Sequence, residues 1–265
     1  MLGAIAGDTI GSAYEFNNTK DYSFRLFTPE SSYTDDSVCT MAVAKWLLED
    51  PGRTADALVK IMVEVCGRYR HPMGGYGSSF AGWLSGADHK PYGSWGNGSA
   101  MRVSACGWVA DTLEETERIA EISASITHNH PEGIMGAQAT AAAIFLARYG
   151  HSKDEIGKYI AERFGYDLDH TWAEIQPGYR WDESCRGTVP QAIICFLDST
   201  DFEDAMRKAV SMGGDSDTLA CICGGIAEAF YGGVPKSIAD PVRALLPDEF
   251  KDILTRFAAT YGNSC

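Results

Sequence analysis

The sequence has few basic residues for its length. Lys and Arg total 22 against 36 Asp and Glu, which gives a net charge of −14. A surface with this balance repels phosphate backbones and anionic lipid, so we expect no binding to nucleic acid or membranes through general electrostatics. Backbone amides in a local pocket can still hold an anion, so a phosphate-bearing small ligand remains compatible with the composition.

Long apolar runs and metal-binding cysteine pairs are also missing. No apolar stretch approaches the roughly 20 residues that span a bilayer. The first segment, MLGAIAGDTIGSAYEF, has no basic lead and carries Asp8 and Glu15, unlike a secretory signal. The eight cysteines include no C-x-x-C pair to hold zinc, and most lie in apolar helical patterns where a free thiol acts as a small hydrophobic group. We therefore expect a reduced, cytoplasmic protein.

Strand-like alternation of apolar and polar residues is nearly absent, and helical periodicity takes its place. Apolar residues recur at helical spacing within 58–69, 219–230 and 250–261. No linker rich in Pro, Ser or charge divides the 265 residues. The sequence predicts one compact all-α domain over residues 1–265, with nine or ten helices. Three helix starts carry the hydroxyl and carboxylate of a capping box: Thr112 with Glu115, Ser152 with Glu155, and Thr200 with Glu203.

Two stretches lack helical periodicity. Residues 71–99 are dense in Gly, Ser and aromatic residues, and residues 165–187 form a second irregular insert. Long loops in a compact helical protein are more often functional than incidental. We expect substrate contacts in these two stretches.

Two acidic segments lie about 180 positions apart, each where a helical pattern begins. Residues 33–40 read YTDDSVCT and contain Asp35 and Asp36, and residues 212–219 read MGGDSDTL and contain Asp215 and Asp217. Helix capping is the simpler interpretation of either segment alone. Each segment, however, has more acids than one cap uses, and a threonine accompanies each pair. Carboxylate and hydroxyl oxygens suit a hard cation such as Mg²⁺ or Mn²⁺.

Electrostatics favours cations if the two segments meet. Two ionised carboxylates about 4 Å apart repel by about 4 kcal/mol at an effective dielectric constant near 20. Four or five converging carboxylates would have to bind protons or cations to offset their mutual repulsion. A divalent ion can offset the charge of several carboxylates at once. Glu15 is a further candidate, with a solvated glutamate at a helix end as the alternative. Asp8 is as compatible with a capping or supporting role as with metal ligation.

Five motifs occur in an order that resembles the ADP-ribosylglycohydrolase family: GAIAGDTIGSAYEF, YTDDS, SWGNGSAMR, ITHNHPEGIMGAQA and GGDSDTLACICGGIAEAFYG. The resemblance runs from residue 3 to about residue 232. It implies a compact orthogonal bundle of α-helices with two divalent cations, Mg²⁺ or Mn²⁺, in a cleft. It also implies that Glu15 lies near the metals and that their ligands are Thr34, Asp35, Asp36, Asp215, Asp217 and Thr218.

The same resemblance assigns a ligand site to the glycine-rich loop. Backbone amides near Gly96 and Gly98, together with the N-terminus of a helix expected near Ala100, would suit a diphosphate. A flexible Gly-Ser turn is the alternative for this loop, and a structural role is the alternative for His128. The residues implied to line the ADP-ribose site are Gly77, Ser94, Trp95, Gly96, Asn97, Gly98 and His128.

The implied activity is removal of ADP-ribose from an ADP-ribosylated protein or small acceptor, with arginine-linked protein as the favoured substrate. The bond between C1″ of the distal ribose and the acceptor atom would be hydrolysed and ADP-ribose released. Glu15, Asp35 and Asp36 are the candidates for a catalytic base, and a monomer is expected. One alternative is a non-catalytic ADP-ribose-binding or structural member of the same fold. Another is an all-α nucleotide pyrophosphatase, whose usual E-x-x-E pairs are missing from the acidic segments.

Overall fold

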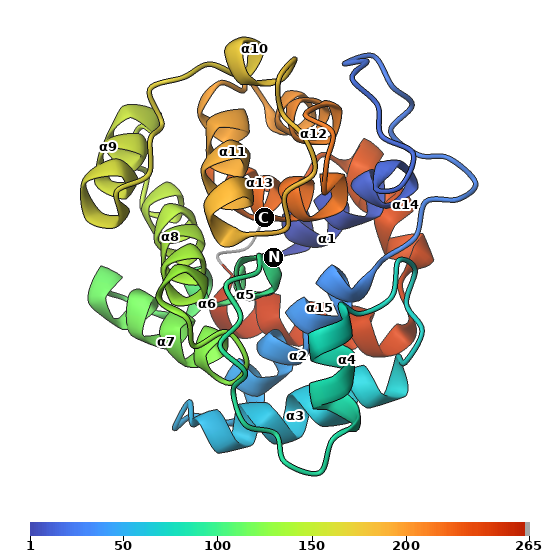
Figure 1. Ribbon diagram of the computed structural model, residues 1–265, viewed down its shortest axis with the longest axis vertical. Helices are drawn as coiled ribbons and strands as arrows, with labels where there is room; N and C mark the ends of the chain where they lie inside the picture. Colours follow the sequence, from blue (N-terminus) through green and yellow to red (C-terminus); the bar gives the residue numbers. More distant parts are fainter. Residues whose placement is uncertain (263–265) are drawn as a thin grey trace.

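The computed structural model describes residues 1–262, and these fold into fifteen α-helices and one 3₁₀ helix (Figure 1). The only β-structure among these residues is two isolated bridges, Thr34 with Met73 and Gly96 with Ser184. The predicted all-α class is therefore confirmed. The helices are more numerous than the nine or ten expected, in part because α5, α6 and α10 are single turns of four residues without a readable period.

The first half of the chain contains α1 (Leu2–Gly11), the 3₁₀ helix η1 (Ser12–Tyr14), α2 (Asp35–Glu49), α3 (Ala55–Arg68), α4 (Ser78–Ser85), α5 (Gly98–Met101), α6 (Cys106–Val109) and α7 (Leu113–Ser125). The second half contains α8 (Pro131–Arg148), α9 (Lys153–Phe164), α10 (Trp172–Ile175), α11 (Cys185–Leu197), α12 (Phe202–Ser211), α13 (Ser216–Tyr231), α14 (Lys236–Leu245) and α15 (Asp248–Tyr261). Within this described part, no helix is both long and apolar enough to cross a membrane.

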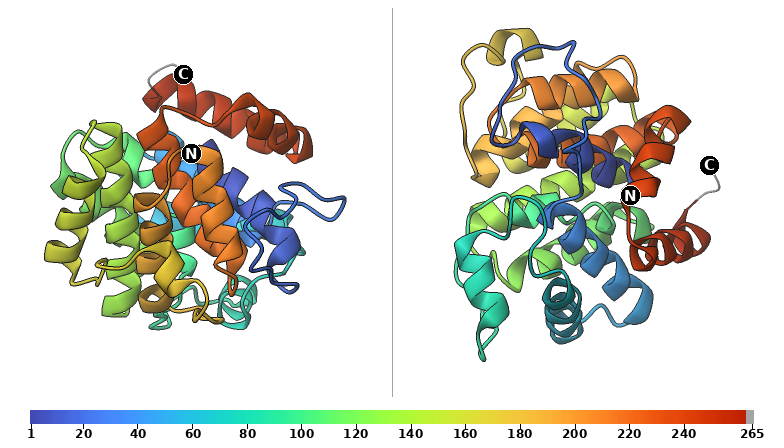
Figure 2. Two further views of the ribbon diagram at one scale, coloured as in Figure 1. Left: turned by 90° about the horizontal axis from the view of Figure 1, so that it is seen from above. Right: turned by 90° about the vertical axis from the view of Figure 1, so that its right-hand side faces the viewer.

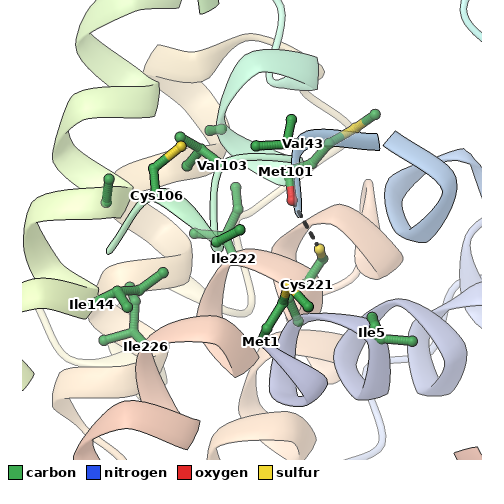
Figure 3. Packing of buried hydrophobic residues seen from close by; sticks show 14 of the residues in the cluster. Met1, Ile5, Val43, Met101, Val103, Cys106, Ile144, Cys221, Ile222 and Ile226 are labelled. Atoms are coloured by element: carbon green, nitrogen blue, oxygen red, sulfur yellow. Dashed lines mark hydrogen bonds between the residues drawn. The ribbon is translucent and has the colours of Figure 1, made fainter. Parts of the chain in front are cut away.

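The periodic segments form the buried faces of α3, α13 and α15. Leu58, Met62 and Val65 of α3 are buried, and α13 buries almost its whole length. The seven cysteines in the described part of the chain are free and buried, consistent with thiols that act as core residues. Figure 3 shows this core around α13, where the Sγ of Cys221 lies 3.2 Å from the carbonyl oxygen of Met101.

One of the three predicted capping boxes is complete, a second is half formed, and the third is wrong. Ser152 and Glu155 form a capping box at α9, and Thr112 accepts from the backbone amide of Glu115 at α7. The predicted box of Thr200 with Glu203 is wrong, because α12 begins one residue later. Its cap is Asp201, which accepts from the amide of Asp204 at 2.9 Å. An aspartate is as good a cap as a threonine, so the sequence does not distinguish the two registers.

Helices α1 and α13 come from opposite ends of the chain and make the most extensive helix contact in the molecule (Figure 1). Glycines at every fourth position of α1 allow this contact. A Cβ atom at Gly7 would lie 1.9 Å from the carbonyl oxygen of Ala220, and one at Gly11 would lie 2.4 Å from the Cα of Asp217. The backbones therefore touch, and the end of α1 lies beside the start of α13. The views in Figure 2 show α14 and α15 along one side of the bundle, where they pack against α1 and α2.

Candidate functional site

The acidic start of α2 is held by a residue of α1. Thr34 is the N-cap, and its side chain accepts from the amide of Asp36 at 3.2 Å. The fully buried carboxylate of Asp8 accepts from the amide and hydroxyl of Thr34, at 3.0 and 2.7 Å, and from the amide of Ser37 at 3.1 Å. Asp8 thus satisfies free amide groups at this helix start and fixes α2 against α1.

The acidic start of α13 is set by two glycines. Gly213 and Gly214 have φ angles of 73° and 72°, a left-handed conformation that other residues rarely adopt. The amide of Gly214 donates to the side-chain oxygen of Asn18 at 2.6 Å. This tight turn ends at Asp215, the residue that precedes α13. The motif therefore needs both glycines to direct its acids toward α1 and α2.

The two acidic segments do meet in space. The hydroxyl of Thr218 donates to Asp36 at 3.3 Å, across 182 positions of sequence. Carboxylate oxygens of Glu15, Asp215 and Asp217 all lie within 4.8 Å of one another. We refer to Glu15, Asp35, Asp36, Asp215 and Asp217 as the acid group.

Burial and crowding raise the pKa of every member of the acid group. For Asp36 and Asp217 the first cause is loss of water, and the charges of neighbouring carboxylates add to it. The pKa of Asp35 and that of Asp215 are raised mainly by burial as well. Burial, with the charge of Asp215, raises the pKa of the half-buried Glu15 to about 7. The group therefore calls for positive charge, as protons or as cations.

Three carboxylate oxygens are oriented for a cation rather than for a protein donor. Glu15 Oε2, Asp36 Oδ2 and Asp217 Oδ1 are buried and accept no hydrogen bond within residues 1–262. Leaving a buried acceptor unsatisfied costs about 1–3 kcal/mol, so each of the three needs a partner. An all-oxygen set of carboxylates and threonine hydroxyls matches the preference of Mg²⁺ and Mn²⁺. The residues present therefore fit a divalent-cation centre.

A pocket of about 420 Å³ lies beside the acid group. The two share Asn97, which lines the pocket and donates from Nδ2 to Asp215 at 2.6 Å. The bridge between Gly96 and Ser184 holds the glycine-rich loop against the second irregular insert. All seven residues predicted to line the ligand site are found in its wall: Gly77, Ser94, Trp95, Gly96, Asn97, Gly98 and His128.

One part of the predicted anion site differs in the structure. The helix expected near Ala100 begins at Gly98 and ends at Met101. A single turn has little dipole, so it adds little positive potential for a diphosphate. Trp95 is 49% exposed, as expected for a residue that could stack on a ligand.

Sequence reasoning missed several residues of the pocket wall. Phe80 and Tyr92 come from the first irregular stretch, and Glu183 comes from the second, so only their general location was predicted. Arg102 also lines the pocket and is 1% exposed. It ends the motif SWGNGSAMR, and a basic residue after a glycine-rich loop was the available signal for it.

The fold and the acid group define a helical protein with a candidate divalent-cation centre beside a ligand pocket. A family model, ADP-ribosylglycohydrolase, matches residues 1–264. The chain belongs to the ADP-ribosylglycohydrolase family, as the motifs predicted.

Relatives matched over most of both chains support this assignment. An uncharacterised protein of Archaeoglobus fulgidus is 29% identical, over 89% of this chain and 88% of its own. ADP-ribosylhydrolase ARH3 of human is 27% identical, over 89% of this chain and 86% of its own, and the mouse protein is equally similar. A solved structure named as an ADP-ribosylglycohydrolase-related protein complex superimposes with a TM-score of 0.75 at 22% identity, covering 98% of this chain and 96% of that one. The last comparison supports the fold alone.

Proposed function

We propose that this protein is a divalent-cation-dependent hydrolase that releases ADP-ribose from an acceptor by cleaving the bond at C1″ of the distal ribose. The observation that carries the proposal is the convergence of Glu15, Asp215 and Asp217, with Asp36 bonded to Thr218 of the same helix start, next to a 420 Å³ pocket whose wall residue Asn97 bonds Asp215. Family membership supports the same reaction class. The metal ligands we propose are Thr34, Asp35, Asp36, Asp215, Asp217 and Thr218.

When bound, Mg²⁺ or Mn²⁺ supplies Lewis-acid polarisation and orientation of ribose hydroxyls or water. The pocket residues then hold ADP-ribose, with Trp95 against a ring and the loop amides near the diphosphate. Glu15 is the residue we assign as acceptor of the proton from the attacking water. Glu15 is only partly buried, and its carboxylate lies within 4.8 Å of those of Asp215 and Asp217, so it can reach a water beside the proposed metal ligands. Asp36 is buried and Asp35 is partly buried, and both serve as ligands in this proposal.

The acceptor we propose is an arginine side chain. Phe16, the residue after Glu15, is 72% exposed, and Trp181 is 45% exposed. Their rings stack with centroids 6.0 Å apart and planes 20° apart. Exposed aromatic faces favour the planar guanidinium group, and Glu183, two positions after Trp181 in the chain, adds negative charge at the pocket wall.

The test is release of ADP-ribose from defined peptides modified on arginine, serine or glutamate, with Mg²⁺, with Mn²⁺ and with excess chelator. We expect release from the arginine peptide, loss of it in chelator, and its return on addition of either ion. The Asp217→Asn variant should lose at least about 100-fold in rate, since one ligand of the centre is lost, whereas Asp111→Asn at an exposed position should keep full rate. Undiminished release in chelator would refute the metal-dependent mechanism. Binding of ADP-ribose without release from any peptide would favour a non-catalytic member of the family.

A further inference from the structure

The buried guanidinium of Arg102 has no carboxylate partner within the described residues. Its Nη2 donates to the carbonyl oxygen of Ser123 at 2.6 Å and to the hydroxyl oxygen of Thr127 at 2.8 Å. Ser123 lies in the last turn of α7, where free carbonyl groups give negative potential. The end of α7 therefore compensates the buried charge without neutralising it.

Thr127 links this cation to His128. Its hydroxyl oxygen lies 2.7 Å from Nδ1 of His128, and both side chains are buried. Arginine has donors only, so Thr127 accepts from Arg102. The hydroxyl hydrogen of Thr127 then has two neighbouring acceptors, Nδ1 of His128 at 2.7 Å and the hydroxyl of Tyr92, and we infer that Nδ1 receives it. A ring nitrogen that accepts this hydrogen carries none of its own.

The other nitrogen of His128 faces the pocket. A Cβ atom at Gly98 would lie 3.1 Å from Nε2, and one at Gly96 would lie 3.8 Å from it. Burial, together with the charge of Arg102, lowers the pKa of His128 to about 2, so the ring is neutral at physiological pH. A neutral ring carries one hydrogen, and with Nδ1 as an acceptor that hydrogen is on Nε2.

We propose that Arg102 and Thr127 are positioning residues that fix His128 in its Nε2–H form, so that it donates a hydrogen bond to a phosphate oxygen of the bound ligand. This inference rests on the proposed function for the identity of the ligand. Arg102 is the only cationic side chain among the described residues of the pocket wall, which favours an anionic group there. A neutral imidazole with its hydrogen fixed on Nε2 selects for a hydrogen-bond acceptor in the ligand, and its charge does not change with pH near neutrality.

The first test is nitrogen-15 NMR of the histidine rings, with the six histidines distinguished by a His128→Gln variant. We expect the Nε2–H pattern for His128 from pH 6 to pH 8. In Thr127→Val, which keeps the shape but removes the hydroxyl, the ring should become a mixture of both neutral forms. Thr127→Ser should restore the wild-type pattern. Thr140→Val is the control, since Thr140 is a buried threonine of α8 whose hydroxyl has no partner in the described residues.

The second test is calorimetric binding of ADP-ribose in the presence of Mg²⁺. Loss of the oriented donor should weaken binding about tenfold in Thr127→Val, the effect of one hydrogen bond to a charged group, with Thr127→Ser and Thr140→Val within about twofold of wild type. An Nδ1–H or charged His128 in the wild type overturns the proposal, as does unchanged binding in Thr127→Val. If the wild type fails to bind ADP-ribose, the proposed function fails, while the NMR result still decides the form of His128.

Discussion

At the scale of single residues, Asn97 is the point where the pocket touches the acid group. Its Nδ2 donates to Asp215 at 2.6 Å and to the hydroxyl of Thr188 at 3.0 Å, and its backbone amide donates to the carbonyl of Glu183 at 2.8 Å. The side-chain amide of asparagine donates hydrogen bonds and is uncharged. It can therefore bond a carboxylate without adding negative charge beside the acid group. Asn97 thus lowers the repulsion at Asp215 while it forms the pocket wall.

The Asn97→Asp variant keeps the size of this side chain but replaces its donor by a carboxylate oxygen. The new carboxylate would face Asp215 at hydrogen-bond distance in a buried site, so repulsion and the lost hydrogen bond should lower the free energy of unfolding by about 2–4 kcal/mol in chelator. Urea denaturation measures this loss. The matched control is Asn129→Asp, because the exposed Asn129 uses its side-chain oxygen to accept from Gly93, and an aspartate retains that acceptor. Equal stability of the two variants in chelator would contradict the role given to Asn97.

Residue identity alone revealed the acids but not the groups that support them. The segments at Asp35 and Asp215 could be found because they hold more carboxylates than a helix cap uses, and the resemblance to the family implied that they meet around cations. Arg102 and Thr127 were not found. Arg102 and Thr127 can act together only because the end of α7 packs against the glycine-rich loop. This long-range contact cannot be predicted from the spacing of residues in the sequence.

At the scale of helices, the site depends on how closely α1 approaches α13. Gly3, Gly7 and Gly11 of α1 all face α13, so the two backbones come into direct contact at these positions. Asp8 then reaches the start of α2 from this same helix. One helix therefore positions both acidic segments, and any separation of α1 from α13 also separates the ligands of the centre.

Substitution of Gly7 by alanine tests this dependence. The added Cβ would lie 1.9 Å from a backbone carbonyl that has no room to move, so we expect a loss of about 3 kcal/mol or more in the free energy of unfolding, measured in urea. The affinity for Mn²⁺ should fall as well. Gly67→Ala in α3 is the control, because nothing lies within 4 Å of its added Cβ and alanine is the better helix former. If Gly7→Ala is as stable as Gly67→Ala, the close contact of α1 with α13 is incorrect.

The helices themselves were largely predictable, and their ends were less so. Apolar periodicity located α3, α13 and α15 because each has a wide buried face. The single turns α5, α6 and α10 are too short to show a period. At α12, Thr200 and Asp201 are both good caps, and only the packing of the first turn decides between them. Tertiary contacts thus set the boundaries that local chemistry leaves open.

At the scale of the whole molecule, the acid group couples the stability of the fold to pH. Burial raises the pKa of Asp8 to about 6 from 3.8 and that of Glu15 to about 7 from 4.5. Between about pH 4 and pH 7 the folded protein therefore holds protons that the unfolded chain has released. Because the folded state binds more protons in this range, the free energy of unfolding decreases as pH rises through it. Bound cations replace these protons, so in their presence the decrease should be smaller or reversed.

Thermal unfolding at pH 5 and pH 8, in chelator and in Mn²⁺, measures this coupling. In chelator we expect the unfolding temperature to be lower at pH 8 by roughly 5 °C or more, since a few kcal/mol corresponds to such a shift in a chain of this size. In Mn²⁺ the difference should shrink or reverse, because the ionised carboxylates then bind the ions. Asp36→Asn removes one titrating acid and should reduce the difference in chelator, whereas the exposed Asp111→Asn should retain it. If the wild-type protein is equally stable at both pH values in chelator, the pKa values of these buried carboxyl groups are not raised. Charge repulsion among them would then give no reason for a bound cation.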